Sequence, residues 1–322
     1  MLGLFRKRDI NSSPAHLLLL SKFLNGNNPN YFAEASYWET PLKEKPMKAI
    51  KWFIKDEMLE PAQLVDLINH KFKVTELKTM LKDRGLKSSG RKEEMVERLI
   101  EHDRDGLTRA TKDVNLFKCT AFGKILAEGY LNRCRRQKEN TEQEVLSYLK
   151  LRRFKEATLT VSKYEAAQIF PRGLGIDWGN YDYTRDTKML EFIFNAKPKT
   201  LSDLDSARRE KINLAVAIIY LWGTNEWNKW VPPGFDSGLI TTDLSVRTIF
   251  SYANFKLNMD DYRNLGIKEV EISVVFDQST CDSCKKLDGR RFKLDQVPTL
   301  PHEKCTSKSG CRCGVMPVSK YG

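Results

Sequence analysis

The C-terminal tail gathers residues that can bind a metal. Five of the seven cysteines fall between positions 281 and 313, together with one histidine. Two thiolates separated by two residues can both reach one tetrahedral ion, and a second cluster further along the chain can close the site. Zinc is the metal expected for these donors. Six candidate ligands compete for four places, with Cys281 and Cys284 nearly forced and the other two drawn from the remaining four: Cys281, Cys284, His302, Cys305, Cys311 and Cys313.

The alternative for this tail is a set of reduced thiols or a disulfide pair. Cys119 and Cys134 stand alone in the middle of the chain, so the cysteines are spread very unevenly. Secreted disulfide-stapled domains distribute an even number of cysteines through a small chain. A tail cluster on a long basic chain instead favours a reducing compartment and a metal.

A second group of residues could bind phosphate. Residues 74–81 carry apolar side chains at helical spacing, with Thr75 expected as the cap of this helix and Gly85 expected to end it. A further helix is expected to start at the Ser-Ser-Gly sequence before Arg91. Arg91 and Lys92 would then lie beside free backbone N–H groups, an arrangement that can bind a phosphate.

Residues 61–103 resemble the SAP family of DNA-binding modules. The family's valine, two leucines, Arg-Gly-Leu turn, Ser-Gly pair, basic residue and closing leucine are matched almost continuously from Val74 to Leu99. The resemblance implies binding to duplex DNA, mostly through its backbone and often at AT-rich sequence. Carried over position by position, it places these residues at the phosphates: Lys82, Arg84, Lys87, Ser89, Gly90, Arg91 and Lys92. The alternative is a small helical hairpin that packs on its neighbours or binds a protein.

Residues 243–318 resemble the C-terminal region of phage head morphogenesis proteins, the minor head proteins related to the F protein of phage Mu. The shared pattern begins Asp-x-x-Thr-Cys-x-x-Cys at Asp277, continues with Leu-Asp-Gly-x-x-Phe and a proline-rich approach, and closes with His and Cys-Arg-Cys. Here Cys305 and residues 306–310 separate His302 from that closing motif, which leaves the fourth ligand open. The resemblance implies portal or capsid proteins as partners, and a location in the bacterial cytoplasm or the virion.

The apolar patterns predict a mainly α fold of several domains, with a small α+β zinc-knuckle region at the C-terminus. Four segments are expected: an N-terminal helical segment at 1–60, the SAP-like module at 61–105, a mainly helical middle domain at 106–240, and a helix, strand and Cys/His tail at 241–322. The apolar stretch near the start, Leu17 to Leu20, is far too short to span a bilayer, so no membrane partner is expected.

The middle region has fewer signals. Long basic helices are expected over 111–155, a long helix over 204–222, a helix over 239–265 and a strand over 270–276. Three tryptophans at roughly helical spacing are assigned to the core rather than to a surface for stacking bases: Trp222, Trp227 and Trp230.

The formal net charge of +12 favours anionic partners without identifying one. Three hypotheses follow. The first is a phage or prophage minor head protein that touches DNA, and the second is a SAP-type accessory factor in repair, chromatin or mobile-element biology with a structural zinc site. A metal-dependent nuclease using Asp177, Asp182 and Asp186 is the third. Because no nucleophile or metallohydrolase motif accompanies these carboxylates, we do not expect an enzyme.

Overall fold

The computed structural model describes residues 13–237 and 240–318. The chain divides into two compact units, residues 1–137 and 138–322, and each is described by itself. The fold is mainly helical with a small sheet near the C-terminus, as predicted. Both ends of the chain, and Leu239 where a helix was expected to begin, lie outside the described residues. None of the helices in the described residues is long and apolar enough to cross a membrane.

The first unit begins with short helices around an apolar core. They are α1 (Pro14–Ser21), α2 (Glu39–Leu42) and α3 (Pro46–Lys55), with 3-10 turns η2 (Pro29–Phe32) and η3 (Ser36–Trp38). Proline occupies the first position of both α1 and α3, where its missing N–H removes no helical hydrogen bond. Phe23, Trp38 and Phe53 are fully or almost fully buried between these helices.

A two-stranded ladder separates this core from a helical module. Strand β1 (Leu59–Pro61) pairs antiparallel with β2 (Phe117–Cys119), so that Leu59 faces Cys119. The N–H of Ala62 also donates to the carbonyl of Leu116 at 2.9 Å. The residues between β1 and β2 therefore leave this ladder and rejoin it at the same point. The strand at 117–119 corrects the expectation of helix from residue 111 onward, because these residues hydrogen-bond to β1 before the next helix starts.

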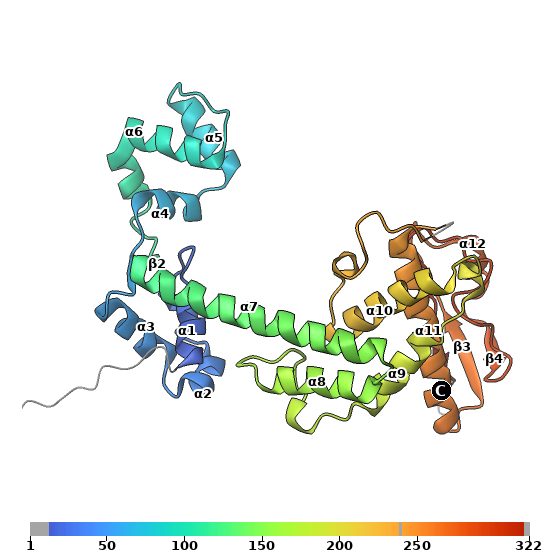
Figure 1. Ribbon diagram of the computed structural model, residues 1–322. Coiled ribbons are helices and arrows are strands. Elements are labelled where there is room, and N and C mark those ends of the chain that lie inside the picture. The colour runs from blue at the N-terminus through green and yellow to red at the C-terminus, as the bar shows by residue number, and fades with distance from the viewer. Residues whose placement is uncertain (1–12, 238–239, 319–322) are drawn as a thin grey trace, which may run out of the picture. The chain divides into compact units, whose positions relative to one another are not determined.

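The inserted module consists of α4 (Leu64–Lys71), α5 (Val74–Asp83) and α6 (Lys92–Ala110), which pack together in Figure 1. Ile68, Leu77, Leu81 and Leu99 are fully buried between the three helices. Helix α6 is kinked at Asp103, whose backbone is not helical. The Asp103 carboxylate accepts the N–H of Gly106 at 2.9 Å and so caps the second half of α6.

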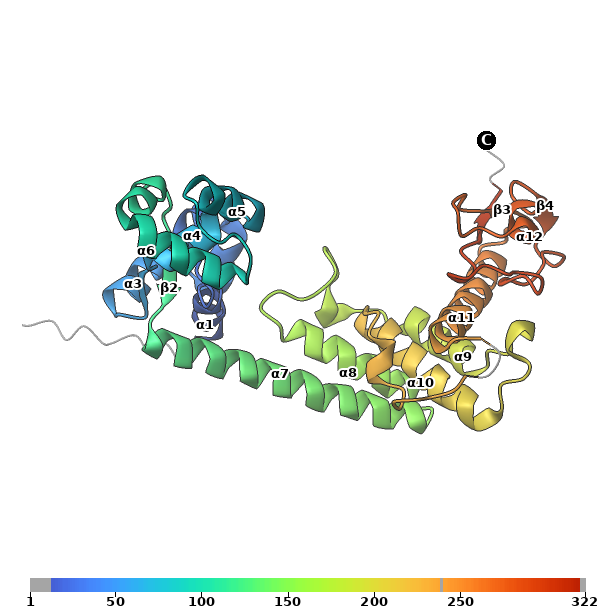
Figure 2. The ribbon, with the colours of Figure 1, turned by 90° about the horizontal axis from the view of Figure 1, so that it is seen from above.

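The second unit is a helical domain followed by the small sheet. Helix α7 (Ala121–Lys150) crosses the boundary between the units, and its C-terminal part lies beside α8 in Figure 2. The remaining elements are α8 (Phe154–Ala166), η4 (Trp178–Asn180), α9 (Thr184–Phe194), η5 (Lys199–Leu201), α10 (Ser206–Trp222), η6 (Trp227–Lys229) and α11 (Thr242–Asn264). Helix α10 carries more of the buried apolar residues of this core than any other helix of the unit. Trp222 is buried in this core, and Trp227 and Trp230 pack against it partly exposed.

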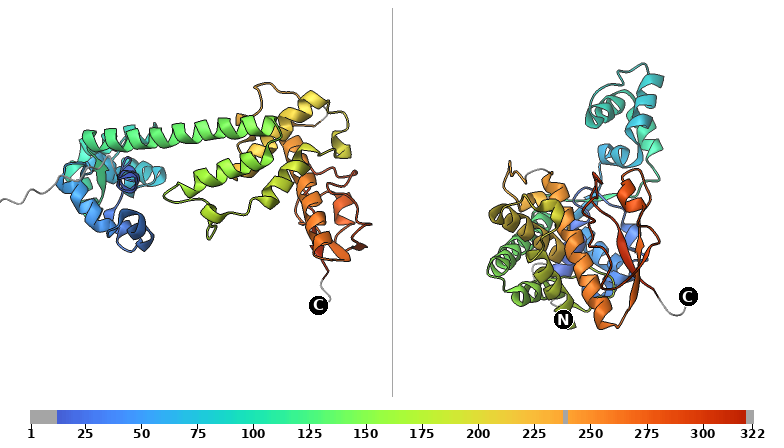
Figure 3. Two further views of the ribbon diagram at one scale, coloured as in Figure 1. Left: turned by 60° about the horizontal axis from the view of Figure 1, so that its bottom comes forward. Right: turned by 90° about the vertical axis from the view of Figure 1, so that its right-hand side faces the viewer.

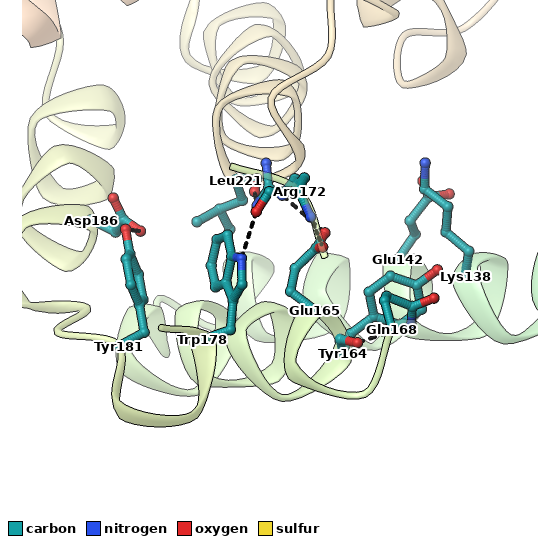
Figure 4. Close-up of polar contacts among 10 residues, drawn as sticks. All are labelled: Lys138, Glu142, Tyr164, Glu165, Gln168, Arg172, Trp178, Tyr181, Asp186 and Leu221. Atoms are coloured by element: carbon teal, nitrogen blue, oxygen red, sulfur yellow. Dashed lines mark hydrogen bonds and ion pairs between the residues drawn. The ribbon is translucent and has the colours of Figure 1, made fainter. Parts of the chain in front are cut away.

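A buried ion pair fixes the loop between α8 and η4. Glu165 is almost fully buried. Its carboxylate accepts one hydrogen bond from Nε of Arg172 at 2.9 Å and another from the Arg172 backbone N–H at 3.1 Å. Arg172 also donates to the carbonyl of Leu221 at the end of α10. The indole N–H of Trp178 donates to the Arg172 carbonyl at 2.6 Å (Figure 4). This network ties the loop to two helices.

The C-terminal sheet has the order β4-β3-β5, with both neighbours antiparallel to β3. It comprises β3 (Glu269–Ser273), β4 (Arg291–Lys293) and β5 (Gly314–Pro317), with the single turn α12 (Asp282–Lys285) between β3 and β4. Helix α11 runs along this sheet, as Figure 3 shows, and Phe255 packs with Val270 and Val315. The strand expected at 270–276 ends at Ser273. The next residue, Val274, donates its N–H to the Asp288 carboxylate instead of to a neighbouring strand.

Candidate nucleic-acid interface and metal centre

The turn after α5 orders the loop that leads to α6. Gly85 has φ +67°, the left-handed conformation that glycine adopts without steric penalty, as the sequence predicted. The N–H of Leu86 then donates to the carbonyl of Leu81 at 2.8 Å. At the other end of α5 the expectation for Thr75 was wrong. The cap position is Lys73, two residues earlier, the helix begins at Val74, and the Glu76 carboxylate accepts the Lys73 N–H at 2.6 Å.

Arg98 holds the loop between α5 and α6 in place. Its guanidinium donates to the carbonyl of Lys87 and, at 2.7 Å, to that of Ser89, while Glu94 lies 3.7 Å from the same group. The loop backbone is thereby fixed from the first turns of α6. No motif singled out Arg98, because its role depends on the carbonyls that the folded loop turns toward it.

Two residues expected at the phosphates bind other parts of the module. Arg84 Nη2 lies 2.7 Å from Oδ2 of Asp103, and Arg84 Nη1 donates to the Met80 carbonyl at 3.1 Å. Lys92 Nζ donates to the Asn69 carbonyl at 2.7 Å, which joins α6 to α4. The hydrogen bond from Arg84, followed by that from the Gly106 N–H, lowers the pKa of Asp103. These contacts fix how the three helices pack.

The other expected residues are exposed. Lys82, Lys87, Ser89, Gly90 and Arg91 all face solvent, and among the described residues no carboxylate pairs with Lys82 or Lys87. Arg91 lies 3.1 Å from Glu94, but its side chain is 85% exposed, so this pair contributes little to stability.

One exposed lysine was missed. Lys78 precedes Lys82 by one helical turn, so both side chains project from the same side of α5. The spacing of four residues, each one position after a buried leucine, was a signal that could have identified it. We call the exposed cations Lys78, Lys82, Lys87 and Arg91 the basic surface of the module.

Comparison with known protein families matches residues 70–104 to the SAP domain. This segment is a SAP domain. The match covers α5, the ordered loop and most of α6, which are the elements that carry the basic surface. It identifies a module and not the family of the whole chain, and it suggests DNA binding for the SAP domain. No curated protein and no solved structure matches the chain.

Five cysteines from three segments converge beside the C-terminal sheet. Cys281 occupies the cap position of α12 and Cys284 lies within that turn. Cys305 comes from the long loop after β4, and Cys311 and Cys313 directly precede β5. Their sulfur atoms form two groups that share Cys284, one with Cys281 and Cys305 and the other with Cys311 and Cys313. These groups could hold a metal ion.

The sulfur separations fit a tetrahedral metal. Sγ of Cys305 lies 3.9 Å from Sγ of Cys281 and 3.6 Å from Sγ of Cys284. Zinc–sulfur bonds of about 2.3 Å place two sulfurs of one tetrahedral site about 3.8 Å apart. A cavity of about 10 Å³ lies among Cys281, Cys284, Cys311 and Cys313, which is room for a single ion. The cysteine set is therefore compatible with zinc.

The protonation of the thiols differs within the cluster. Burial raises the pKa of Cys281, but hydrogen bonds from the backbone N–H groups of Thr306 and Cys284, together with contacts to the Cys284 and Cys305 thiols, outweigh burial and lower this pKa to about 7. Burial is the main cause that raises the pKa of Cys284. A bound cation would favour the thiolate form at every ligand, because only the thiolate coordinates.

His302 lies in another environment. It belongs to neither sulfur group, and its Nδ1 accepts the N–H of Lys304 at 3.3 Å. With Lys199, Tyr252 and Glu303 it lines a separate hollow next to the sheet. The structure thus brings together the five cysteines of the six candidate ligands and leaves the histidine apart.

Polar contacts outside the sulfur cluster fix the loops that carry the cysteines. Asp277 accepts a hydrogen bond from Arg312, between the last two cysteines, and the N–H of Ser279 at 2.8 Å. The Arg312 contact is the main cause that lowers the pKa of Asp277 to about 2. Ser307 Oγ donates to the Gly310 carbonyl at 2.9 Å. The loop between β3 and α12 and the loop between β4 and β5 are therefore ordered by contacts other than sulfur.

The three aspartates considered for a nuclease bind protein groups. Asp177 accepts the N–H groups of Gly179 and Asn180 and so caps η4, and Asp182 accepts the N–H of Thr184 at the start of α9. Asp186 accepts the hydroxyls of Tyr220 at 2.6 Å and Tyr181 at 2.8 Å; Tyr181 and Asp186 are drawn in Figure 4. In residues 13–237 and 240–318, these carboxylates form no group that could hold a metal.

Proposed function

We propose that this protein binds duplex DNA through the basic surface of its SAP domain, and that a zinc ion held by four of the five clustered cysteines stabilises its C-terminal sheet. The observation that carries the proposal is the SAP match on a module whose α5 and following loop present lysines without an acidic partner in the part of the chain that the structure describes. Lysine and arginine contacts to phosphates release counterions and need no particular base sequence.

Phosphates would meet the exposed lysines first. Lys78 and Lys82 project from one side of α5, and Lys87 and Arg91 flank the loop that Arg98 orders. The loop is fixed before binding, so little conformational entropy is lost when it meets DNA. Arg84 and Lys92 support this surface by joining helices and keep N–H groups that a phosphate could also use.

A salt series of duplex binding tests the proposal. We would compare the full chain with a triple variant, Lys78→Gln, Lys82→Gln and Lys87→Gln, and with a control that removes the same charge elsewhere in the first unit, Arg104→Gln, Arg109→Gln and Lys112→Gln. Each phosphate contact contributes about −0.9 to the slope of log K against log salt. The triple lysine variant should bind duplex DNA more weakly, and the magnitude of its slope should be smaller by about 2 to 3.

The control should retain most of the slope of the unmodified chain. Equal losses in both variants would show that net charge alone drives binding and that the basic surface has no special role. Absence of salt-dependent binding in the unmodified chain would remove the DNA-binding role and leave the SAP domain as a protein-docking hairpin.

We propose further that the protein is a phage or prophage minor head protein. The support is the sequence pattern of residues 243–318, including Cys281, Cys284 and the closing Cys-Arg-Cys, together with a DNA-binding module in the same chain. Both roles are binding roles, and we propose no catalytic step. The partners proposed with it are portal or capsid proteins.

Mass spectrometry of purified, nuclease-treated heads from a strain that carries the gene tests this assignment. A minor head protein should be present in a fixed number of copies per head. Its absence from heads, with recovery in the cellular DNA fraction, would favour the SAP-type accessory factor instead.

A further inference from the structure

A cavity of about 540 Å³ lies in the second unit, where α10 ends beside the first half of α11. Its volume falls in the range of roughly 300 to 1,000 Å³ that small-molecule sites occupy. No residue of the SAP domain lines it, and the sulfur cluster borders it only through Cys311, on the loop before β5 that forms one wall. The side chains that matter for its chemistry are Tyr220, Trp227, Asp243, Arg247, Phe250 and Arg312.

Three aromatic side chains, Tyr220, Trp227 and Phe250, line the cavity. The rings of Tyr220 and Phe250 lie 6.3 Å apart between centroids, and Phe250 is 38% exposed although it is a large apolar residue. Trp227 is held by its indole N–H, which donates to Oδ1 of Asp243 at 3.0 Å. Rings that are fixed and yet partly exposed offer faces on which a planar ligand can stack.

Two arginines, Arg247 and Arg312, also line the cavity. Arg247 Nε lies 2.8 Å from Oδ2 of Asp243, and Arg312 binds Asp277, which does not line the cavity. A guanidinium has five N–H donors, so each arginine keeps donors for a ligand. Both oxygens of the Asp243 carboxylate already accept a hydrogen bond, Oδ1 from Trp227 and Oδ2 from Arg247. The cavity therefore has spare donors for an anion.

We propose that this cavity binds a nucleotide, with the base stacked on its aromatic side chains and the phosphate at Arg247 and Arg312. Guanidinium groups match phosphate oxygens in geometry as well as charge, and bases of any sequence stack on aromatic side chains. The same chemistry is offered by a free mononucleotide and by an unpaired nucleotide of a DNA strand. The site uses residues of the second unit alone, so it stands independently of duplex binding by the SAP domain.

Titration calorimetry with dAMP tests the site. The zinc-loaded full chain would be compared with Phe250→Ala and Arg247→Gln, which change exposed side chains, and with Arg263→Gln as a control. Arg263 lies on the same helix, is exposed and does not line the cavity. Phe250→Ala and Arg247→Gln should each weaken dAMP binding about tenfold or more, while Arg263→Gln leaves it unchanged. Deoxyadenosine and inorganic phosphate should each bind more weakly than dAMP.

A five-residue oligodeoxyadenylate distinguishes the two sources of ligand. Tighter binding of the oligonucleotide than of dAMP, lost in both cavity variants, identifies an unpaired strand as the occupant, whereas equal affinity identifies a free nucleotide. The triple lysine variant of the SAP domain should leave dAMP binding intact. The proposal is overturned if neither probe binds at millimolar concentration, or if Phe250→Ala and Arg247→Gln bind both probes as the unmodified chain does. Circular dichroism and zinc content confirm that each variant is folded.

Discussion

Arg84 and Asp103 join α5 to the kink of α6 through an ion pair of 2.7 Å between Nη2 and Oδ2. A residue that sequence reasoning places at the DNA thus also sets the angle at which two helices of the SAP domain meet. Loss of DNA binding in an Arg84 variant would therefore mix two causes, since both the contact and the shape of the module would change. The basic surface of Lys78, Lys82 and Lys87 is a cleaner target for substitution.

Acid should loosen the SAP domain through Asp103. The hydrogen bond from Arg84 is the main cause that lowers the pKa of Asp103 in the folded chain, so the ion pair stabilises the domain at neutral pH. That stabilisation should be lost as the pH falls from the pKa of Asp103 in the unfolded chain through its lower pKa in the folded chain. Amide hydrogen exchange of residues 74–110 at pH 6 and near pH 3 checks this. In Asp103→Asn the difference between the two pH values should shrink; an undiminished difference would assign it to other carboxylates.

Removing a buried leucine should unfold the SAP domain without disturbing the metal centre. Leu81 is fully buried among α4, α5 and α6, and Leu81→Ala should lower the free energy of unfolding of the domain by about 2 to 5 kcal/mol. Duplex binding would fall with it, while zinc content stays the same, because the five clustered cysteines lie in the other unit. Urea titration followed by hydrogen exchange measures the first effect. Concerted loss of zinc would contradict the division into two units.

Cys284 should be the cysteine whose loss affects metal binding most. It is buried and belongs to both sulfur groups. We expect about one zinc per chain in the unmodified protein and none after Cys284→Ala, with faster hydrogen exchange in β3 and β4, because a structural ion contributes directly to local folding. Cys134→Ala, on α7, serves as the control and should keep its zinc. Full zinc in Cys284→Ala would exclude this cysteine as a ligand.

Glu165 should stabilise the second unit through Arg172. Glu165→Ala leaves the guanidinium and the Arg172 N–H without their acceptor in a partly buried loop, so we expect a loss of about 1 to 3 kcal/mol. Thermal unfolding measures it. Glu156→Ala is the comparison, since Glu156 pairs with Arg153 at the surface and should change stability little. Similar losses in the two variants would argue against a special role for the buried pair.

The sequence predicted best where local chemistry decides the outcome. The apolar spacing of Leu77, Leu81 and Leu99 fixes the helices of the SAP domain, and Gly85 adopts the left-handed turn expected of it. The convergence of Cys281 and Cys284 follows from their spacing on one turn. These features depend on residues within a few positions of one another.

Long-range pairing was not predictable in the same way. The β1–β2 ladder joins residues that are far apart in the sequence, and residues 117–119 are too few to show a strand pattern. The separation of His302 from the sulfur atoms depends on how the loop after Pro301 folds back. The partners of Arg84, Lys92 and Arg98 are backbone or carboxylate oxygens that only the assembled module brings near.

The pairing of Leu59 with Cys119 means that the inserted module, which contains the SAP domain, has its two ends side by side. A segment with adjacent ends can be lost, gained or exchanged between genes while the chain on either side keeps its path, since only a short turn is needed to reconnect β1 to β2. The SAP domain is in this sense a cassette. The surrounding helices would keep their core whether the cassette is a DNA binder, another small domain or a simple hairpin.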